Sequence, residues 1–268
     1  MTKAYQTVTM DNILYSCAYQ EQRSTEQFLG IHAVSYILSG ELQLTIAEGT
    51  RVLKAGTMGL VKRNQLVRAI KKPAPGGEFR AINIFLNTDI LRRYSTQRGL
   101  VADGLRREEG FYELPNDAFV KAFFDSLQPY FQQPERMTSL MTELKSQEVI
   151  ELILSIAPDF KDVLFDFHEP HKIDLEAFML RNFMFNVPID TMAKLSGRSQ
   201  AGFKRDFSKL FGTSPGLWLK QRRLQEAYYL IKDKGIKPSA AYLEVGFENL
   251  SHFSLAFKQA FGVNPSAL

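Results

Sequence analysis

The last third of the chain contains the same pattern twice, and this repeat constrains the fold more than any other feature. A shift of fifty residues places aromatic residues, glycines and prolines of one copy on those of the other. The matched pairs are Phe203 and Phe253, Phe207 and Phe257, Phe211 and Phe261, Gly212 and Gly262, and Pro215 and Pro265. Because an internal repeat of this kind indicates repeated supersecondary structure, both copies are expected to fold alike.

The spacing inside each copy predicts two helices joined by a turn. Three aromatic residues four apart fall on one helical face, and a glycine with a proline three residues later is typical of a helix end. A shorter apolar segment precedes each aromatic helix, at residues 189–195 and 239–245, and each leads into a glycine turn. Two helices joined by a tight turn, the second one basic, are typical of a helix-turn-helix motif. The alternative is a helical bundle in which the aromatic stripes are only core.

Residues 174–266 resemble the DNA-binding domain of the AraC/XylS family of bacterial transcription regulators. The residues that carry the resemblance are Met192, Ala193, Ser199, Phe203, Lys204, Arg205, Phe207, Gly212, Ser214, Pro215, Trp218, Leu219, Arg222, Arg223, Leu224, Ala227, Leu230, Gly246, Phe247, Ser251, Phe253, Phe257, Lys258, Gly262 and Pro265. The chain departs from the family at Ala241-Tyr242, where Ile-Ala is usual, and at Leu255-Ala256, where a basic residue is common.

The resemblance implies double-stranded DNA as a partner and RNA polymerase as the contact through which such a regulator activates transcription. A long helix, expected at 217–232, would hold the two recognition helices in successive major grooves. The expected DNA-binding residues of the first copy are Arg198, Ser199, Gln200, Ala201, Lys204, Arg205 and Lys209. Those of the second copy are Asn249, Leu250, Ser251, His252, Leu255 and Lys258.

The cations of the first copy suit phosphate contacts, and Arg and Lys also recognise guanine. By motif position, the base-facing residues are Gln200, Ala201, Lys204 and Arg205 in the first copy, and Leu250, Ser251, His252 and Leu255 in the second. Two alternatives stay open. Arg205 could instead pair with Asp206 and hold the fold, and His252 could serve only to cap its helix. In the second copy, Asn249 or Ser251 could begin the helix.

Residues 1–86 predict short strands separated by turns. The expected strands are 31–38, 41–46, 51–53, 59–61, 66–70 and 79–86, a pattern typical of a small β-barrel or jelly roll. This region resembles the cupin-type N-terminal domain of many AraC/XylS regulators. Helices are then expected at 89–94, 117–131 and 134–157, and in this family similar helices form dimers. The fold class is therefore α+β, with a regulatory and dimerisation domain at 1–160, a linker at 161–172 and the DNA-binding domain at 173–268.

Charge is divided unevenly between these regions. Residues 171–268 contain 14 Lys and Arg against 8 Asp and Glu, whereas residues 1–170 contain 19 against 21. This asymmetry is typical of a DNA-binding domain joined to a domain with another task. A single cysteine, Cys17, allows no intramolecular disulfide. Without a membrane-length apolar run or an N-terminal signal segment, the protein is expected in the cytoplasm, with no membrane partner.

An enzymatic cupin would need clustered metal ligands. Only His32 of the four histidines lies in the strand region, while His168 and His171 lie in the expected linker. A lone strand histidine is more often structural than a metal ligand, so no metal, cofactor or catalytic residue is expected. The N-terminal domain is expected to bind a small effector or a regulatory protein. The alternative function is a ligand-binding cupin whose helical C-terminal domain mediates protein contacts.

Overall fold

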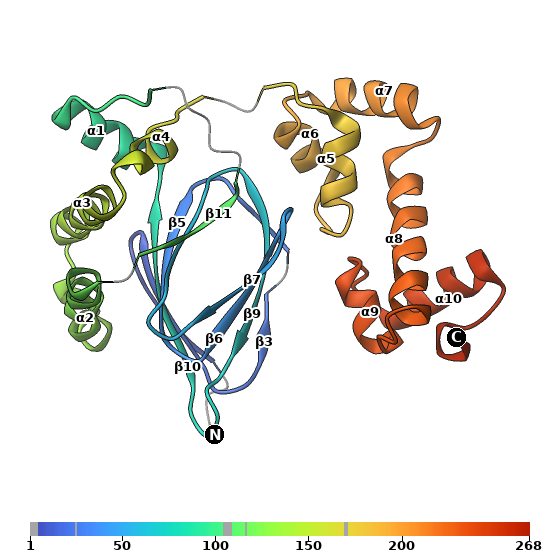
Figure 1. Ribbon diagram of the computed structural model, residues 1–268, viewed down its shortest axis with the longest axis horizontal. Helices are drawn as coiled ribbons and strands as arrows, with labels where there is room; N and C mark the ends of the chain where they lie inside the picture. The colour runs from blue at the N-terminus through green and yellow to red at the C-terminus, as the bar shows by residue number, and fades with distance from the viewer. Residues whose placement is uncertain (1–4, 25, 104–108, 116, 169–170) are drawn as a thin grey trace. The chain divides into compact units, whose positions relative to one another are not determined.

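The computed structural model describes residues 5–24, 26–103, 109–115, 117–168 and 171–268. These residues divide into two compact units, Met1–His168 and Glu169–Leu268. The first unit contains every described strand and four helices, and the second is helical (Figure 1). The predicted α+β class is therefore confirmed, with strands first and helix-turn-helix elements last.

The first unit is built on two antiparallel sheets. One has six strands in the order β1-β2-β10-β5-β8-β11, and the other has the order β3-β9-β6-β7, with β4 also pairing with β9. The bounds are β1 Tyr5–Met10, β2 Ile13–Ala18, β3 Gln22–Arg23, β4 Gln27–Leu29, β5 His32–Ser39, β6 Glu41–Ile46, β7 Gly49–Lys54, β8 Met58–Val61, β9 Gln65–Lys72, β10 Phe79–Leu86 and β11 Phe111–Leu114. No ladder joins the two sheets among the described strands, so the cupin-like fold is present but the barrel is not closed.

The six-stranded sheet is buried on both faces. In β5, Val34 and Tyr36 belong to the cluster shared with the helices, whereas Ala33 and Ile37 belong to the cluster between the two sheets. This follows from the period-two alternation of a strand, because successive side chains point to opposite faces. The run of six buried residues in β5 is therefore apolar on both sides of the strand, apart from His32 and Ser35.

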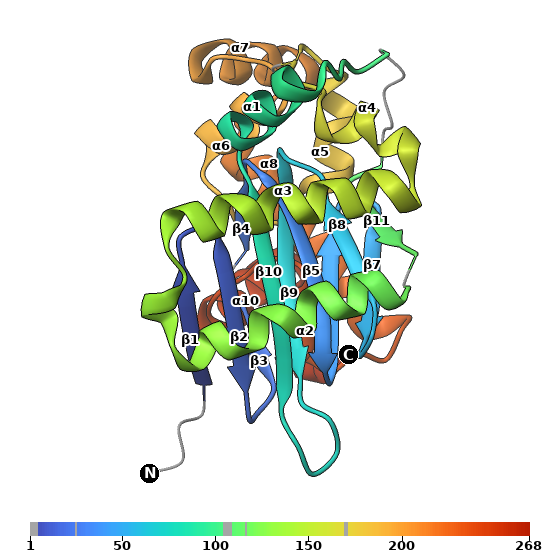
Figure 2. The same ribbon diagram turned by 90° about the vertical axis from the view of Figure 1, so that its left-hand side faces the viewer.

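Helices cover the outer face of this sheet. They are α1 Thr88–Arg98, α2 Ala118–Gln132, α3 Ser139–Ile156 and α4 Lys161–Leu164, with short 3-10 turns η1 Pro134–Arg136 and η2 Pro158–Phe160. Figure 2 shows α2 and α3 lying across the strands. The helix or helix pair predicted over 134–157 is η1 followed by α3, which begins at a Thr138 cap.

The expected linker, residues 161–172, differs from the structure at its start. Val163, Leu164 and Phe165 are buried in the first unit's core, because α4 packs its apolar side against the sheet-covering helices. Residues 161–168 thus belong to the first unit. Glu169 and Pro170 of the expected linker lie outside the described residues.

The second unit places two helix pairs on one long helix (Figure 1). Its elements are α5 Leu175–Asn182, α6 Ile189–Leu195, α7 Gln200–Phe211, α8 Pro215–Lys232, α9 Pro238–Glu244, α10 Leu250–Phe261 and η3 Pro265–Ala267. The predicted connecting helix is α8. At 1.5 Å per residue, its 18 residues span about 27 Å.

Helix α5 ends earlier than the sequence predicts. Asp174 as a cap and Pro188 as a helix breaker predict a helix from Asp174 to Asn186, but α5 stops at Asn182. The chain then makes a tight turn in which the Phe185 amide donates to the Asn182 carbonyl. The carbonyls of Phe183 and Phe185 accept hydrogen bonds from Arg223 of α8, so tertiary contacts replace the last helical turn.

Candidate nucleic-acid interface

The first helix-turn-helix motif is formed by α6 and α7. The turn between them contains Gly197, whose φ of +69° favours glycine. A Cβ there would lie 2.3 Å from the His171 carbonyl, so close backbone approach also requires glycine. Ser199 begins α7 by accepting a hydrogen bond from the Gly202 amide at 3.2 Å, as its capping role predicts.

The aromatic stripe determines which face of α7 points outward. Phe203 and Phe207 are fully buried, and the ring of Phe207 lies 5.8 Å from Trp218 of α8. Phe211 lies 4.9 Å from the same indole. Because these rings hold one face against α8, the opposite face of α7 is presented to solvent.

The predicted base-facing residues of α7 lie on this exposed face. They are Gln200, Ala201, Lys204 and Arg205, with Lys209 also exposed near the helix end. The Arg205 side chain is 80% exposed, and its Nε lies 3.7 Å from the neighbouring Asp206 carboxylate. An ion pair this exposed stabilises little, so it leaves the guanidinium available to a ligand.

The second motif is formed by α9 and α10, with the same construction. Gly246, at φ +87°, turns the chain where a Cβ would lie 2.4 Å from the Met184 carbonyl oxygen. Asn249 is the residue that begins α10, because its side chain accepts from the His252 amide at 2.9 Å. Phe253 and Phe257 are fully buried, and the Phe257 ring stacks 6.1 Å from Tyr228 of α8. Trp218 and Tyr228 therefore give α8 one aromatic residue that packs against each motif.

The outward face of α10 is chemically different from that of α7. Leu250 is 40% exposed and Leu255 is 58% exposed. Ser251, His252 and Lys258 are exposed beside them. All four base-facing residues predicted for the second copy are thus exposed, and Lys258 is the one permanent cation among the DNA-binding residues expected in that copy.

Comparisons with known proteins agree with this architecture. A model described as a helix-turn-helix domain matches residues 192–268, and one described as the ExsA N-terminal regulatory domain matches residues 32–163. The regulator ExsA of Pseudomonas aeruginosa is 23% identical over 243 residues, covering 87% of this chain and 84% of ExsA. The virulence regulon transcriptional activator VirF of Yersinia enterocolitica is 26% identical over 131 residues, and the chain spans about half of it, 48%.

The chain belongs to the AraC family of transcription regulators. Members of this family are not enzymes. Among solved structures, ToxT from Vibrio cholerae aligns with 99% of this chain and 97% of its own at 14% identity, with a TM-score of 0.41.

One expected DNA contact points inward in this AraC-family domain. The Arg198 side chain is 8% exposed, and its Nε lies 3.2 Å from the Asp206 carboxylate. Its Nη1 donates to the carbonyls of Ile173 at 3.0 Å and Ser196 at 2.7 Å. Through its Nε and Nη1, Arg198 ties α7 to the turn and to the segment before α5, and its buried side chain is not available to phosphates, contrary to the prediction from the sequence.

Asp206 is the acid around which this inward cluster forms. Lys172 Nζ lies 3.0 Å from the same carboxylate. The hydrogen bond from Lys172, followed by the one from Arg198, lowers the pKa of Asp206 below its usual 3.8. The corresponding residue of the second motif is Ala256, so only the first motif contains this cluster.

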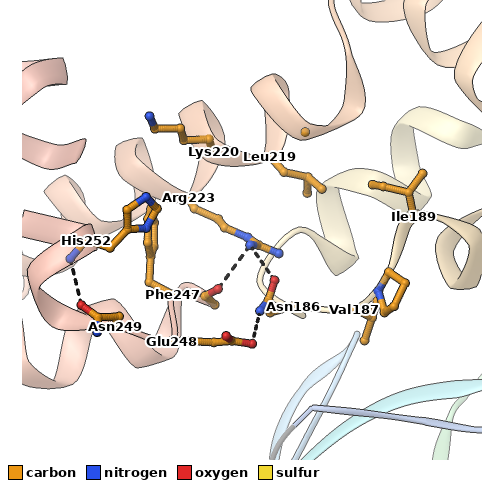
Figure 3. A pocket seen from close by; sticks show the side chains of 13 residues that line it. Asn186, Val187, Ile189, Leu219, Lys220, Arg223, Phe247, Glu248, Asn249 and His252 are labelled. Carbon is orange, nitrogen blue, oxygen red and sulfur yellow. Dashed lines mark hydrogen bonds between the residues drawn. The ribbon is translucent and has the colours of Figure 1, made fainter. Parts of the chain in front are cut away.

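Arg223 is the structural residue whose role the sequence did not reveal. Its guanidinium donates to the carbonyls of Phe183 at 2.7 Å, Phe185 at 2.9 Å and Gly246 at 3.2 Å. The same side chain reaches the Asn186 amide oxygen at 3.3 Å (Figure 3). Arg223 therefore links the end of α5 to the turn of the second motif. The available signal was its position four residues from both Leu219 and Ala227, which places Arg223 on the buried face of α8.

A cavity of about 490 Å³ lies next to Arg223. Figure 3 shows that Asn186, Glu248 and His252 line it, with Lys220 on the α8 side. Asn186 donates to Glu248 at 2.6 Å, which connects the loop before α6 to the loop before α10. The cavity is thus bounded by both motifs and by the helix that joins them.

His32 of the first unit is a buried structural histidine. It is 1% exposed, and its Nδ1 accepts from the Arg63 amide at 3.4 Å. Burial, with repulsion from Arg63 and Lys62, lowers the pKa of His32 to about 3, which keeps the imidazole neutral. Among the described residues, no group of three His, Cys, Asp or Glu side chains is arranged to hold a metal ion. Nor is any described helix long and apolar enough to span a membrane.

Proposed function

We propose that this AraC-family regulator binds double-stranded DNA in a sequence-specific way and activates transcription under the control of its first unit. The observation that carries the proposal is the pair of exposed helix faces, on α7 and α10, that the buried aromatic stripes hold outward from α8. VirF is named a transcriptional activator, which supports the same sign of regulation here. RNA polymerase is the proposed partner in activation.

The contacts proposed for the first motif are Gln200, Ala201, Lys204 and Arg205 on bases, with Lys209 and the α7 start at Ser199 close to phosphates. Those for the second motif are Leu250, Ser251, His252 and Leu255 on bases, with Asn249 and Lys258 at the ends of the same helix. Cations within reach of phosphate supply affinity, whereas base edges supply specificity. The first motif is therefore proposed as the stronger DNA-binding element.

Selection from a random double-stranded library with the full chain tests the proposal. We expect one enriched sequence with two conserved blocks about one helical turn apart. Affinity for that sequence should exceed affinity for a scrambled one by at least about 10³-fold at physiological salt. Equal affinity for both would refute sequence-specific binding and favour a protein-contact role for the helical unit. A promoter carrying the sequence, transcribed with purified RNA polymerase, tests activation.

Control through the first unit could use a small effector or a partner protein. The apolar residues between the two sheets, among them Ile37, Leu44 and Phe79, are buried and pack against one another. A packed interior favours a partner that binds the outer surface. Thermal shifts of the full chain with candidate ligands test the effector, and co-purification from cells tests the protein partner.

A homodimer is the remaining proposal for the first unit. Phe119 of α2 is 73% exposed, and Leu140 and Leu144 of α3 are 67% and 48% exposed. Large apolar side chains exposed on adjacent helices suit a helix-to-helix interface. Analytical ultracentrifugation should show a dimer that Leu140→Ser with Leu144→Ser converts to a monomer. An unchanged mass for the double variant would exclude this face.

A further inference from the structure

The outward face of α10 carries apolar groups where α7 carries polar ones. The fifty-residue shift places Leu250 on Gln200 and Leu255 on Arg205. Both leucines are exposed, at 40% and 58%. The core side of α10 is occupied by Phe253, which is fully buried, so these leucines are not part of that packing. Their side chains are therefore available to whatever the outward face binds.

The neighbouring polar groups on this face offer little direct recognition of guanine. The Ser254 hydroxyl donates to the Leu250 carbonyl at 2.8 Å, which uses its proton inside the helix. His252 and Ser251 are exposed near the start of the helix, and Lys258 lies in its last turn. Bidentate recognition of guanine uses Arg or Lys, and α10 has neither in its first two turns, before Lys258.

In the major groove, thymine alone among the four bases presents a methyl group. An exposed leucine on a recognition helix would bury its own methyl groups against the thymine methyl group. We infer that α10 recognises thymine methyl groups through Leu255 and Leu250, whereas α7 recognises its bases through Lys204 and Arg205. This inference rests on the proposed function, because it concerns the specificity of the same DNA-binding surface.

The test replaces thymine by deoxyuracil, which removes only the methyl group. In the sequence selected by the full chain, each thymine is replaced in turn and the Kd is measured. Loss of one buried methyl, at about 0.8 kcal/mol, should weaken binding about fourfold at one or more positions. At the thymine that Leu255 contacts, the ratio of the Kd with uracil to the Kd with thymine should fall to about one in Leu255→Ala. Leucine and alanine are both strong helix formers, so the exposed substitution should leave α10 folded.

Lys204→Ala provides the matched control. It should weaken binding to the selected sequence and relax the preference at the base that Lys204 contacts, while keeping the thymine-to-uracil ratio of the wild-type protein at the α10 positions. The inference is overturned if no uracil replacement weakens the specific complex. It is equally overturned if every replacement has the same effect on the Kd in Leu255→Ala and in Leu250→Ala as in the wild-type protein. It is also overturned if Leu255→Ala binds the selected site normally but loses activation, since the face would then contact a protein. If selection enriches no sequence at all, the proposed function fails first, which is a distinguishable result.

Discussion

The two helix-turn-helix motifs share one construction but differ in the chemistry of their outer faces. Each has a glycine turn with positive φ, a capped second helix and two fully buried phenylalanines. On α7 the exposed face contains Lys204, Arg205 and Lys209, whereas on α10 it contains two leucines and one lysine. Packing and recognition are thus separable, because the repeat retains the residues that build the motif and varies those that would contact DNA.

Removal of a core ring should have the largest effect, and it should be equal in the two motifs. Phe207 and Phe257 are fully buried and occupy matching positions. Truncation of either to alanine should lower the free energy of unfolding of its motif by about 3–5 kcal/mol. Hydrogen exchange of the α7 and α10 amides in each variant measures the loss for each motif separately. A loss confined to Phe207→Ala would show that the two cores are not equivalent.

Arg223→Met should have the next largest effect, since it leaves the carbonyls after α5 and the carbonyl in the turn of the second motif without their donor. Hydrogen bonds from a charged group contribute about 1.5–3 kcal/mol, so the second unit should lose about that much stability. Arg222→Met is the matched control on the same helix. Arg222 pairs with the partly exposed Glu226 at 3.3 Å and lies 4.8 Å over the Phe183 ring. Its loss should cost about 1 kcal/mol or less.

Chemical denaturation followed by far-ultraviolet circular dichroism measures both variants. Arg223→Met should also bind DNA with relaxed dependence on the distance between the two conserved blocks, because the turn of the second motif loses its tie to the segment that leads into the first motif. If Arg222→Met were the more destabilising of the two, the bridging role of Arg223 would be wrong.

The local parts of this architecture are predictable from the sequence, and the non-local parts are not. Spacing of Phe203, Phe207 and Phe211 predicts α7 and its buried face, because residues four apart share a helical side. The inward position of Arg198 depends on Asp206, eight residues away on the next helix, and on carbonyls of other segments. The hydrophobic periodicity of the sequence does not predict these hydrogen-bond partners of Arg198.

The first unit shows the same limit. Several strands are predicted from alternation, and β6 and β10 begin and end where expected. The pairing of β10 with both β2 and β5 brings together segments that are far apart in the chain, so the strand order follows from packing. In the expected linker, the polar residues at its start give no indication that Val163 and Leu164, which follow them, are buried in the core.

Substitution of the exposed cations should separate the motifs by specificity. Arg205→Ala should cost about 1–3 kcal/mol of binding and relax preference at one base pair. Lys258→Ala should weaken binding evenly across sequences and reduce the salt slope by about one. Titrations of single-base variants at several salt concentrations measure both quantities. A changed base preference in Lys258→Ala, or an unchanged one in both Arg205→Ala and Lys204→Ala, would contradict the proposed division.

The smallest expected difference appears on acidification. The hydrogen bonds from Lys172 and Arg198 give Asp206 a lower pKa in the folded state than in the unfolded chain. Its stabilising contribution is therefore present above the ordinary pKa of 3.8 and is lost as pH falls through the lower folded value. Ala256 replaces this acid in the second motif, so α10 has no matching loss.

Amide exchange between about pH 5 and pH 2 should then show α7 losing protection relative to α10, after correction for the intrinsic rate. Asp206→Asn should abolish the difference by removing the titrating group while retaining the size of the side chain. Parallel loss of protection in the two helices of the wild-type protein would mean that the cluster of Arg198, Lys172 and Asp206 does not stabilise the first motif. The asymmetry between the motifs would then be confined to the surfaces proposed to contact DNA.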